Sequence, residues 1–284
     1  MRPAPLLRSL AALRWGALFA LASCTAVIPQ PSTPSEEVAR LERFTYETVD
    51  GPVSALRAGA TANPRVIYVH GSPGDARGWA DFLVPPLAGA ESIAIDRPGF
   101  GESAEHGAVV ELAAQAHALE PLLVQRDGRW PLLVGHSLGA PIILRAAADF
   151  PDRVGGLVLL SGSVDPDLER LRWYNYLAKG VAWFLPRDLR RSNDEMWDLK
   201  PELQALAADL DRVRCPVWIV HGEDDGLVPV ANVDFVRKAL ASRLRDVVVL
   251  DDAGHLLIWE ERAKAQVREV LANAMLSLAS APKQ

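Results

Sequence analysis

The sequence has few cysteines and no excess of positive charge. Only two of its 284 residues are cysteines, Cys24 and Cys215, so a fold held together by several disulfides is excluded. No grouping of residues indicates a metal site. The formal net charge is −6, and no cluster of lysine and arginine follows the N-terminal region, which argues against a nucleic-acid-binding protein. We therefore expect neither a metal nor a nucleic-acid partner.

What remains is the composition of a globular protein. Apolar residues make up 49% of the chain and charged residues 23%, both close to average. A chain of this length can bury enough surface to form a core without disulfides. The length suits one large domain or two small ones.

The first two dozen residues follow a different pattern. Three arginines and no acidic residue precede a short apolar stretch, Trp15–Ala22. This order is typical of a secretory signal peptide, and the stretch is too short for a permanent membrane-spanning helix. It ends in the tetrapeptide Leu-Ala-Ser-Cys at positions 21–24. That tetrapeptide resembles the bacterial lipobox, whose cysteine receives a diacylglyceryl thioether before the signal peptidase cuts in front of it.

The resemblance implies that residues 1–23 are a lipoprotein signal peptide and that Cys24 is the lipidated first residue of an exported protein. The rest of the protein would then be held on a membrane of the bacterial cell envelope. Residues 24–41, with three prolines among small polar residues, would form the tether. An ordinary signal peptide and an uncleaved anchor with an incidental Cys24 remain alternatives. Cys215, which precedes an apolar run, is expected to be a buried thiol.

Beyond the tether, short apolar runs alternate with longer helical patterns. The first two runs flank an Asp-Gly pair at positions 50–51 and predict a hairpin. Continuous apolar runs separated by helices predict a mostly parallel sheet flanked by helices, an α/β fold, with its core in residues 42–164 and 215–284. The expected strands are 44–49, 53–57, 66–69, 92–95, 132–134, 157–160, 217–220 and 247–250, and the expected helices are 79–87, 109–124, 138–149, 230–240 and 258–278.

Residues 165–214 interrupt this alternation. They contain no strand-like run but six large aromatic residues. Because the segment would emerge beyond the carboxyl ends of the strands, where ligands of parallel sheets bind, we expect a helical cap over the site. The alternative is a set of ordinary surface helices whose aromatic side chains pack on the edge of the sheet.

The main chemical signal is the pentapeptide Gly-His-Ser-Leu-Gly at positions 135–139, a G-x-S-x-G motif. The motif alone is weak evidence, but here it follows a strand-like run and opens a helical pattern, the context that exposes a nucleophilic serine. The tight turn strains the backbone at Ser137, and the flanking glycines remove side chains that would collide. Ser137 is therefore the candidate nucleophile. The alternative is a helix start that merely has glycines on both sides.

A serine nucleophile needs a base, and six histidines compete for that role. His255 follows the last strand-like run and precedes the last helical pattern, which places it on a loop at the same edge of the sheet as Ser137. The histidine beside the serine should point elsewhere, and two that end strands should pack or bind loop backbone. His255 is therefore the candidate base; the five others are His70, His106, His117, His136 and His221.

The base in turn needs a carboxylate that fixes its tautomer. Asp224 and Asp225 are adjacent after the strand-like run 217–220, so the residues alone leave both possible.

The chain order Ser, Asp, His and the motifs around it resemble the α/β-hydrolase superfamily over roughly residues 44–278. In that family the acid usually falls at the fourth position of a G-x-x-D motif, which implies Asp225. Some members place it after the preceding strand, which makes Asp165 a rival. One oxyanion-hole amide follows the nucleophile, at Leu138. The other comes from the x position of an HG-x-PG loop, here residues 70–74, which implies Ser72. The segment 96–103 matches a further family motif whose role is structural.

The resemblance implies hydrolysis of an ester-like bond in a small-molecule substrate by two-step acyl transfer, without a metal or organic cofactor. A serine at position 137 argues against dehalogenases and epoxide hydrolases, whose nucleophile is an aspartate. Lactonases, carbon–carbon bond hydrolases, aminopeptidases and cofactor-free peroxidases share the same triad and remain possible. A non-catalytic binding lipoprotein is the remaining alternative. Substrate, membrane and oligomeric state stay open.

Overall fold

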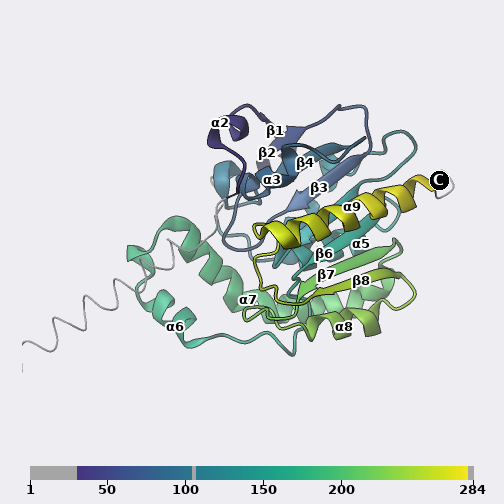
Figure 1. Cartoon of the computed structure of the whole chain (residues 1–284). Coiled ribbons are helices and arrows are strands. Elements are labelled where there is room, and N and C mark those ends of the chain that lie inside the picture. The colour runs from purple at the N-terminus through teal and green to yellow at the C-terminus, as the bar shows by residue number, and fades with distance from the viewer. Residues whose placement is uncertain (1–30, 104–106, 281–284) are drawn as a thin grey trace, which may run out of the picture. The chain divides into compact units, whose positions relative to one another are not determined.

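The computed structural model describes residues 31–103 and 107–280. Within them the chain forms an eight-stranded sheet in the order β1-β2-β4-β3-β5-β6-β7-β8 (Figure 1). The pairs β1–β2 and β2–β4 are antiparallel and all others are parallel, so the expected hairpin and the mostly parallel sheet are confirmed. The strands are β1 (Glu42–Thr48), β2 (Gly51–Ala58), β3 (Arg65–Val69), β4 (Glu91–Ile95), β5 (Leu132–His136), β6 (Gly156–Leu160), β7 (Val217–Gly222) and β8 (Leu244–Leu250).

Helices cover both faces of this sheet, which is why its central strands are apolar along their whole length (Figure 1). Every residue of β4, β5, β6 and β7 is buried. One hydrophobic cluster joins one face of the sheet to α4 (Leu112–His117), α5 (Gly139–Asp149), α8 (Asn232–Ala239) and the second half of α7 (Arg187–Asp209). A second cluster joins the other face to α3 (Ala80–Leu83) and α9 (Glu261–Ser280).

Two of the expected helices are shorter than predicted, and proline is the reason in both. The predicted helix 79–87 is a turn of 3₁₀ helix, Ala76–Trp79, followed by α3, and it ends before Pro85 because the residue preceding a proline is forced toward extended backbone. The predicted helix 109–124 is α4 followed by a 3₁₀ turn, Glu120–Leu122. Pro121 lacks the amide that a continuous helix would need.

Between β6 and β7 the chain forms helices and no strand. They are α6 (Trp173–Gly180), a 3₁₀ turn (Ala182–Phe184), α7 and a second turn (Leu210–Arg212). Trp173, Trp183 and Phe184 are exposed to 75%, 80% and 74%. These three side chains therefore do not pack on the edge of the sheet, and the helical cap stays a prediction. Cys215, which follows the segment, is buried as expected, and burial raises the pKa of its thiol to about 12.

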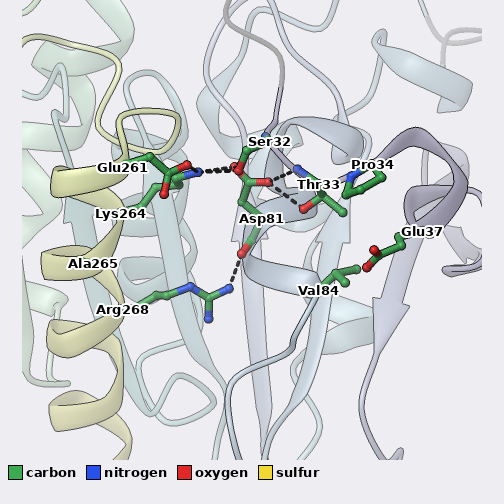
Figure 2. Close-up of a pocket in the computed structure, with 10 residues that line it drawn as sticks. All are labelled: Ser32, Thr33, Pro34, Glu37, Asp81, Val84, Glu261, Lys264, Ala265 and Arg268. Atoms are coloured by element: carbon green, nitrogen blue, oxygen red, sulfur yellow. Dashed lines mark hydrogen bonds and ion pairs between the residues drawn. The ribbon is translucent and has the colours of Figure 1, made fainter.

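The start of the described chain is fixed to the core through one carboxylate (Figure 2). Asp81 accepts hydrogen bonds from the amides and hydroxyls of Ser32 and Thr33, at 2.6–3.0 Å, and forms an ion pair of 2.7 Å with Lys264. Burial alone would raise the pKa of Asp81, but the hydrogen bonds from Lys264 and Thr33 hold it well below its usual range. Short α2 (Ser35–Val38) follows. The segment after residue 33 therefore starts from a fixed point.

The signal peptide and lipidation predicted for residues 1–24 lie outside the described residues. In the described part of the chain, no helix has the length and apolar character needed to cross a membrane.

Candidate active site

The G-x-S-x-G motif forms a sharp turn between β5 and α5, as its context in the sequence predicts. Ser137 has a φ of +55°, a left-handed conformation that is strained for a serine. A Cβ on Gly135 would collide with the carbonyl of Gly139, and a Cβ on Gly139 would collide with the carbonyl of Val69. Only glycine fits on either side, so the turn projects Ser137 at the carboxyl edge of the sheet.

His255 and Asp225 meet on the loops that follow β8 and β7. The His255 Nδ1 atom lies 2.7 Å from Asp225 Oδ2, and the other oxygen of Asp225 accepts the amides of Leu227 and Val228 at 2.9 and 2.8 Å. Burial would raise the pKa of Asp225, but the hydrogen bond from His255 and the two amides lower it below the ordinary value. An ionised Asp225 holds the proton on Nδ1 and leaves Nε2 of the ring as the base.

The competing carboxylates do not contact this histidine. Asp224 is exposed, and the side chain of Asp165 accepts the amide of Asp167 at 2.8 Å instead. Within the described residues, Asp225 is the carboxylate that hydrogen-bonds His255. The geometry therefore separates the two adjacent aspartates, which the residues alone could not do.

Three other histidines are held by backbone carbonyls. His70 Nδ1 lies 2.7 Å from the carbonyl of the next residue, His221 Nε2 lies 2.9 Å from that of Val228, and His136 Nε2 lies 2.9 Å from that of His255. Burial lowers the pKa of His70 and of His136 to about 3, so both are neutral at pH 7 and poor bases. His136 also packs against the ring of His255, with centroids 4.9 Å apart. It therefore positions the candidate base, a role that the sequence did not indicate.

No hydrogen bond between the Ser137 hydroxyl and the His255 ring is present among the described residues. In enzymes without substrate, catalytic hydrogen bonds are often long and shorten only in the reacting complex. The contact between His136 and His255 nevertheless brings the base to the residue that immediately precedes the nucleophile.

The loop predicted to supply an oxyanion amide runs directly against the nucleophile. A Cβ built on Gly71 would lie 2.8 Å from Cβ of Ser137 and 3.4 Å from its Oγ. In the described part of the chain, neither the Ser72 amide nor the Leu138 amide donates a hydrogen bond to a protein acceptor. Both amides therefore remain available for a substrate oxygen, which is the requirement for an oxyanion hole.

A buried network links this loop to the segment between β6 and β7. Arg97 and Glu195 are 0% and 2% exposed and form an ion pair of 2.6 Å. Arg97 donates to the carbonyl of Gly71 at 2.9 Å, Gln115 donates to Glu195 at 2.8 Å, and the hydroxyl of Ser72 donates to Glu195. Helix α7 thus holds the candidate oxyanion loop through a carboxylate. The sequence did not reveal Glu195, because it is one of several charges on a polar helix.

A cavity of about 470 Å³ lies beside this site. Ser163, on its wall, donates its amide to the carbonyl of Ser137 over 3.4 Å, and Leu227 follows Asp225 by two residues. The cavity is also lined by residues 168–172, which precede α6, so the inserted segment forms part of the wall. A small or medium-sized ligand would fit this volume.

Comparisons with known proteins agree with this geometry. The model of the family described as alpha/beta hydrolase fold matches residues 64–195. An esterase of Mycobacterium tuberculosis is 35% identical over 143 residues, which are 50% of this chain and 45% of the esterase. A 2-hydroxy-6-oxononadienedioate/2-hydroxy-6-oxononatrienedioate hydrolase of Burkholderia vietnamiensis is 27% identical over 259 residues, covering 74% of this chain and 88% of that one. The chain thus spans less than half the length of the esterase.

Solved structures show the same fold. The crystal structure of a membrane phospholipase A, described as a novel bacterial virulence factor, has a TM-score of 0.65 and 20% identity, and the match covers 97% of this chain and 98% of that one. The sheet order, the match of the family model to residues 64–195 and this structural likeness show that the chain has the α/β-hydrolase fold. The proteins that it resembles include an esterase.

Proposed function

We propose that the protein hydrolyses carboxylic esters of small molecules by two-step acyl transfer. The nucleophile is Ser137, His255 is the general base, and Asp225 orients it. The observation that carries the proposal is the 2.7 Å hydrogen bond between His255 and Asp225, on the loops that share a sheet edge with the strained Ser137. A binding protein would need none of these features together.

The proposed reaction proceeds as follows. His255 Nε2 takes the proton of the Ser137 hydroxyl as its oxygen attacks the ester carbonyl, and the amides of Leu138 and Ser72 bind the resulting oxyanion. The intermediate collapses, the bond to the alcohol breaks, and His255 returns the proton to the departing oxygen. Water then loses a proton to His255, attacks the acyl-enzyme, and releases the acid and free Ser137. This chemistry involves no metal or organic cofactor.

A second candidate is the reaction of the Burkholderia vietnamiensis relative. That protein is named as a hydrolase of 2-hydroxy-6-oxononadienedioate and 2-hydroxy-6-oxononatrienedioate, and the alignment extends over 74% of this chain. Such a reaction would use the same nucleophile and base. A panel of p-nitrophenyl esters of increasing chain length, assayed beside lactones and this dienedioate, separates the substrate classes.

Labelling of Ser137 by a fluorophosphonate tests the chemistry itself. The wild-type chain should be labelled at Ser137, because the reagent phosphonylates only a serine activated by a base. Ser137→Ala should lose the label and ester hydrolysis together, whereas Ser242→Ala, a change at an exposed serine, should retain both. Labelling of the Ser137→Ala chain at an unchanged level, or no labelling of the wild type, would refute the proposal.

We further propose that the protein is an exported lipoprotein, anchored at Cys24 to a membrane of the bacterial cell envelope. The support is the charged and apolar pattern before Leu-Ala-Ser-Cys at positions 21–24. Mass spectrometry of protein extracted from membranes should find an N-terminal Cys24 that carries lipid, and Cys24→Ala should abolish both the lipid and the cleavage. An unmodified Cys24 in the mature wild type would contradict this proposal.

A further inference from the structure

The exposed apolar residues of this protein are concentrated in one place. Among the described residues, eleven large hydrophobic side chains are exposed, and six of them fall within residues 173–184. Every exposed aromatic residue in the described chain is among those six. Single exposed apolar side chains are ordinary, but a contiguous group marks an interaction surface. The six are Trp173, Tyr174, Tyr176, Leu177, Trp183 and Phe184, which we call the aromatic patch.

The aromatic patch is organised by the helix beneath it. Trp173, Tyr176 and Leu177 are spaced by three and four residues in α6, so they share one face of that helix. Trp183 and Phe184 follow in the next turn, with ring centroids 4.6 Å apart. These two rings thus contact each other while both side chains remain largely exposed to solvent.

The same stretch is strongly basic although the chain as a whole is acidic. Residues 170–191 contain six arginines and lysines and one acidic residue, whereas the whole chain has a net charge of −6. The acidic residue, Asp188, pairs with Arg187. In the described structure, none of the five remaining basic side chains forms an ion pair with a carboxylate. These unneutralised cations are Arg170, Arg172, Lys179, Arg190 and Arg191.

Tryptophan and tyrosine prefer the boundary between hydrocarbon and water, and short helices with aromatic and basic residues lie in that boundary. Cationic side chains are attracted to anionic lipid headgroups. We propose that the aromatic patch and the basic residues around it dock on the surface of an anionic lipid bilayer. The aromatic rings enter the headgroup region and the basic side chains contact lipid phosphates.

Docking would bring the candidate active site to the lipid surface. Arg172, which immediately precedes the aromatic patch, donates to the carbonyls of Gly226 and Leu227, which follow Asp225 directly. The basic, aromatic stretch therefore starts next to the carboxylate of the proposed triad. Substrates that partition into a membrane would meet the enzyme where they reside, and this consequence rests on the proposed hydrolase activity.

The fixed start of the domain strengthens this interaction if Cys24 carries lipid. Ser32 and Thr33 are bound to Asp81, so seven residues lie between Cys24 and this fixed point, and the eight residue-to-residue steps span at most about 28 Å. A tether this short gives a weak docking surface a high effective concentration of lipid. The docking itself does not depend on the tether.

Vesicle binding by the unlipidated chain tests the proposal without reference to catalysis. Residues 24–284 carrying Cys24→Ala, the chain that the proposed cleavage would leave, are sedimented with vesicles of phosphatidylcholine alone or mixed with phosphatidylglycerol, because residues 1–23 are basic and apolar and would themselves bind anionic lipid. Anionic vesicles should bind this chain about ten-fold more tightly. Trp183→Ser with Phe184→Ser should lower that binding about ten-fold, and Lys179→Glu with Arg190→Glu should remove the preference for phosphatidylglycerol.

Matched controls lie outside the stretch. Leu276→Ser and Arg245→Glu change an exposed apolar and an exposed basic residue elsewhere, and both should leave binding unchanged. Thermal melting checks that every variant is folded. Brominated phospholipids should quench part of the tryptophan fluorescence of the wild type. The Trp183→Phe variant should lack this quenched part. Two results would overturn the proposal: vesicle binding unaffected by either double variant, or a dimer in solution that Trp183→Ser with Phe184→Ser dissociates.

Discussion

Replacing Asp225 by Asn is expected to lower kcat for ester hydrolysis by about 10⁴-fold. In the wild type, the ionised carboxylate accepts the proton on Nδ1 of His255 at 2.7 Å, and Nε2 is left to accept the serine proton. The amide of the substituted side chain can instead donate to Nδ1, which moves the ring proton to Nε2 and removes the base. Because this side chain does not touch substrate, KM should change little. Steady-state kinetics with a p-nitrophenyl ester measures both constants.

Two neighbouring carboxylates provide the controls for this experiment. Asp224→Asn changes an exposed residue and should leave kcat within about two-fold, as should Asp165→Asn, whose side chain binds the amide of Asp167. Thermal melting verifies that the loop of the Asp225→Asn variant is intact, since the Asp225 carboxylate also accepts two backbone amides. If Asp224→Asn or Asp165→Asn caused the large loss and Asp225→Asn did not, the acid would be misassigned.

The sheet could be predicted from the sequence because its central strands are buried on both faces. Ile67–Val69 and Leu157–Leu160 are short continuous apolar runs bounded by glycines or polar residues. Such a run does not have the spacing of an amphipathic helix, so it predicts a buried strand. The helix ends were less predictable. Apolar periodicity continues past Pro85 and Pro121. A proline has no backbone N–H and restricts the backbone conformation of the residue before it, so the helix ends there regardless of the apolar pattern.

The candidate triad could be predicted from the sequence for a related reason. Ser137, Asp225 and His255 each follow a strand, and the carboxyl ends of parallel strands lie at one edge, so position in the chain specifies position in space. The choice between Asp224 and Asp225 came from family resemblance rather than from physics. In the structure, burial and two backbone amides distinguish them.

The network around Glu195 could not be predicted from any local pattern. Glu195 and Arg97 are 98 residues apart in sequence, and a glutamate on a helix with many charges is ordinarily solvated. Only the packing of α7 against the core shows that this one glutamate is buried. The exposure of the aromatic patch could not be predicted from the sequence either, because aromatic residues in a helical segment ordinarily predict a buried face.

Replacing Glu195 by Ala is expected to lower the free energy of unfolding by about 3–5 kcal/mol, because Arg97 would stay buried without its partner. Glu195→Gln keeps a side chain that can accept from Ser72 and Arg97, so it should cost less. Asp198→Ala alters an exposed carboxylate of the same helix and should change stability by no more than about 0.5 kcal/mol. Urea unfolding of the three variants measures these differences.

The same variants decide whether Glu195 positions the oxyanion loop or only supports the fold. Glu195 accepts the Ser72 hydroxyl and pairs with Arg97, which in turn binds the Gly71 carbonyl, so loss of the carboxylate loosens the loop at two points. A displaced Ser72 amide stabilises the oxyanion less well, so kcat should fall by about 10²-fold in Glu195→Ala at a temperature where it is folded, with KM nearly constant. Glu195→Gln should recover most of that loss. A folded Glu195→Ala enzyme with wild-type kcat would limit Glu195 to a role in stability.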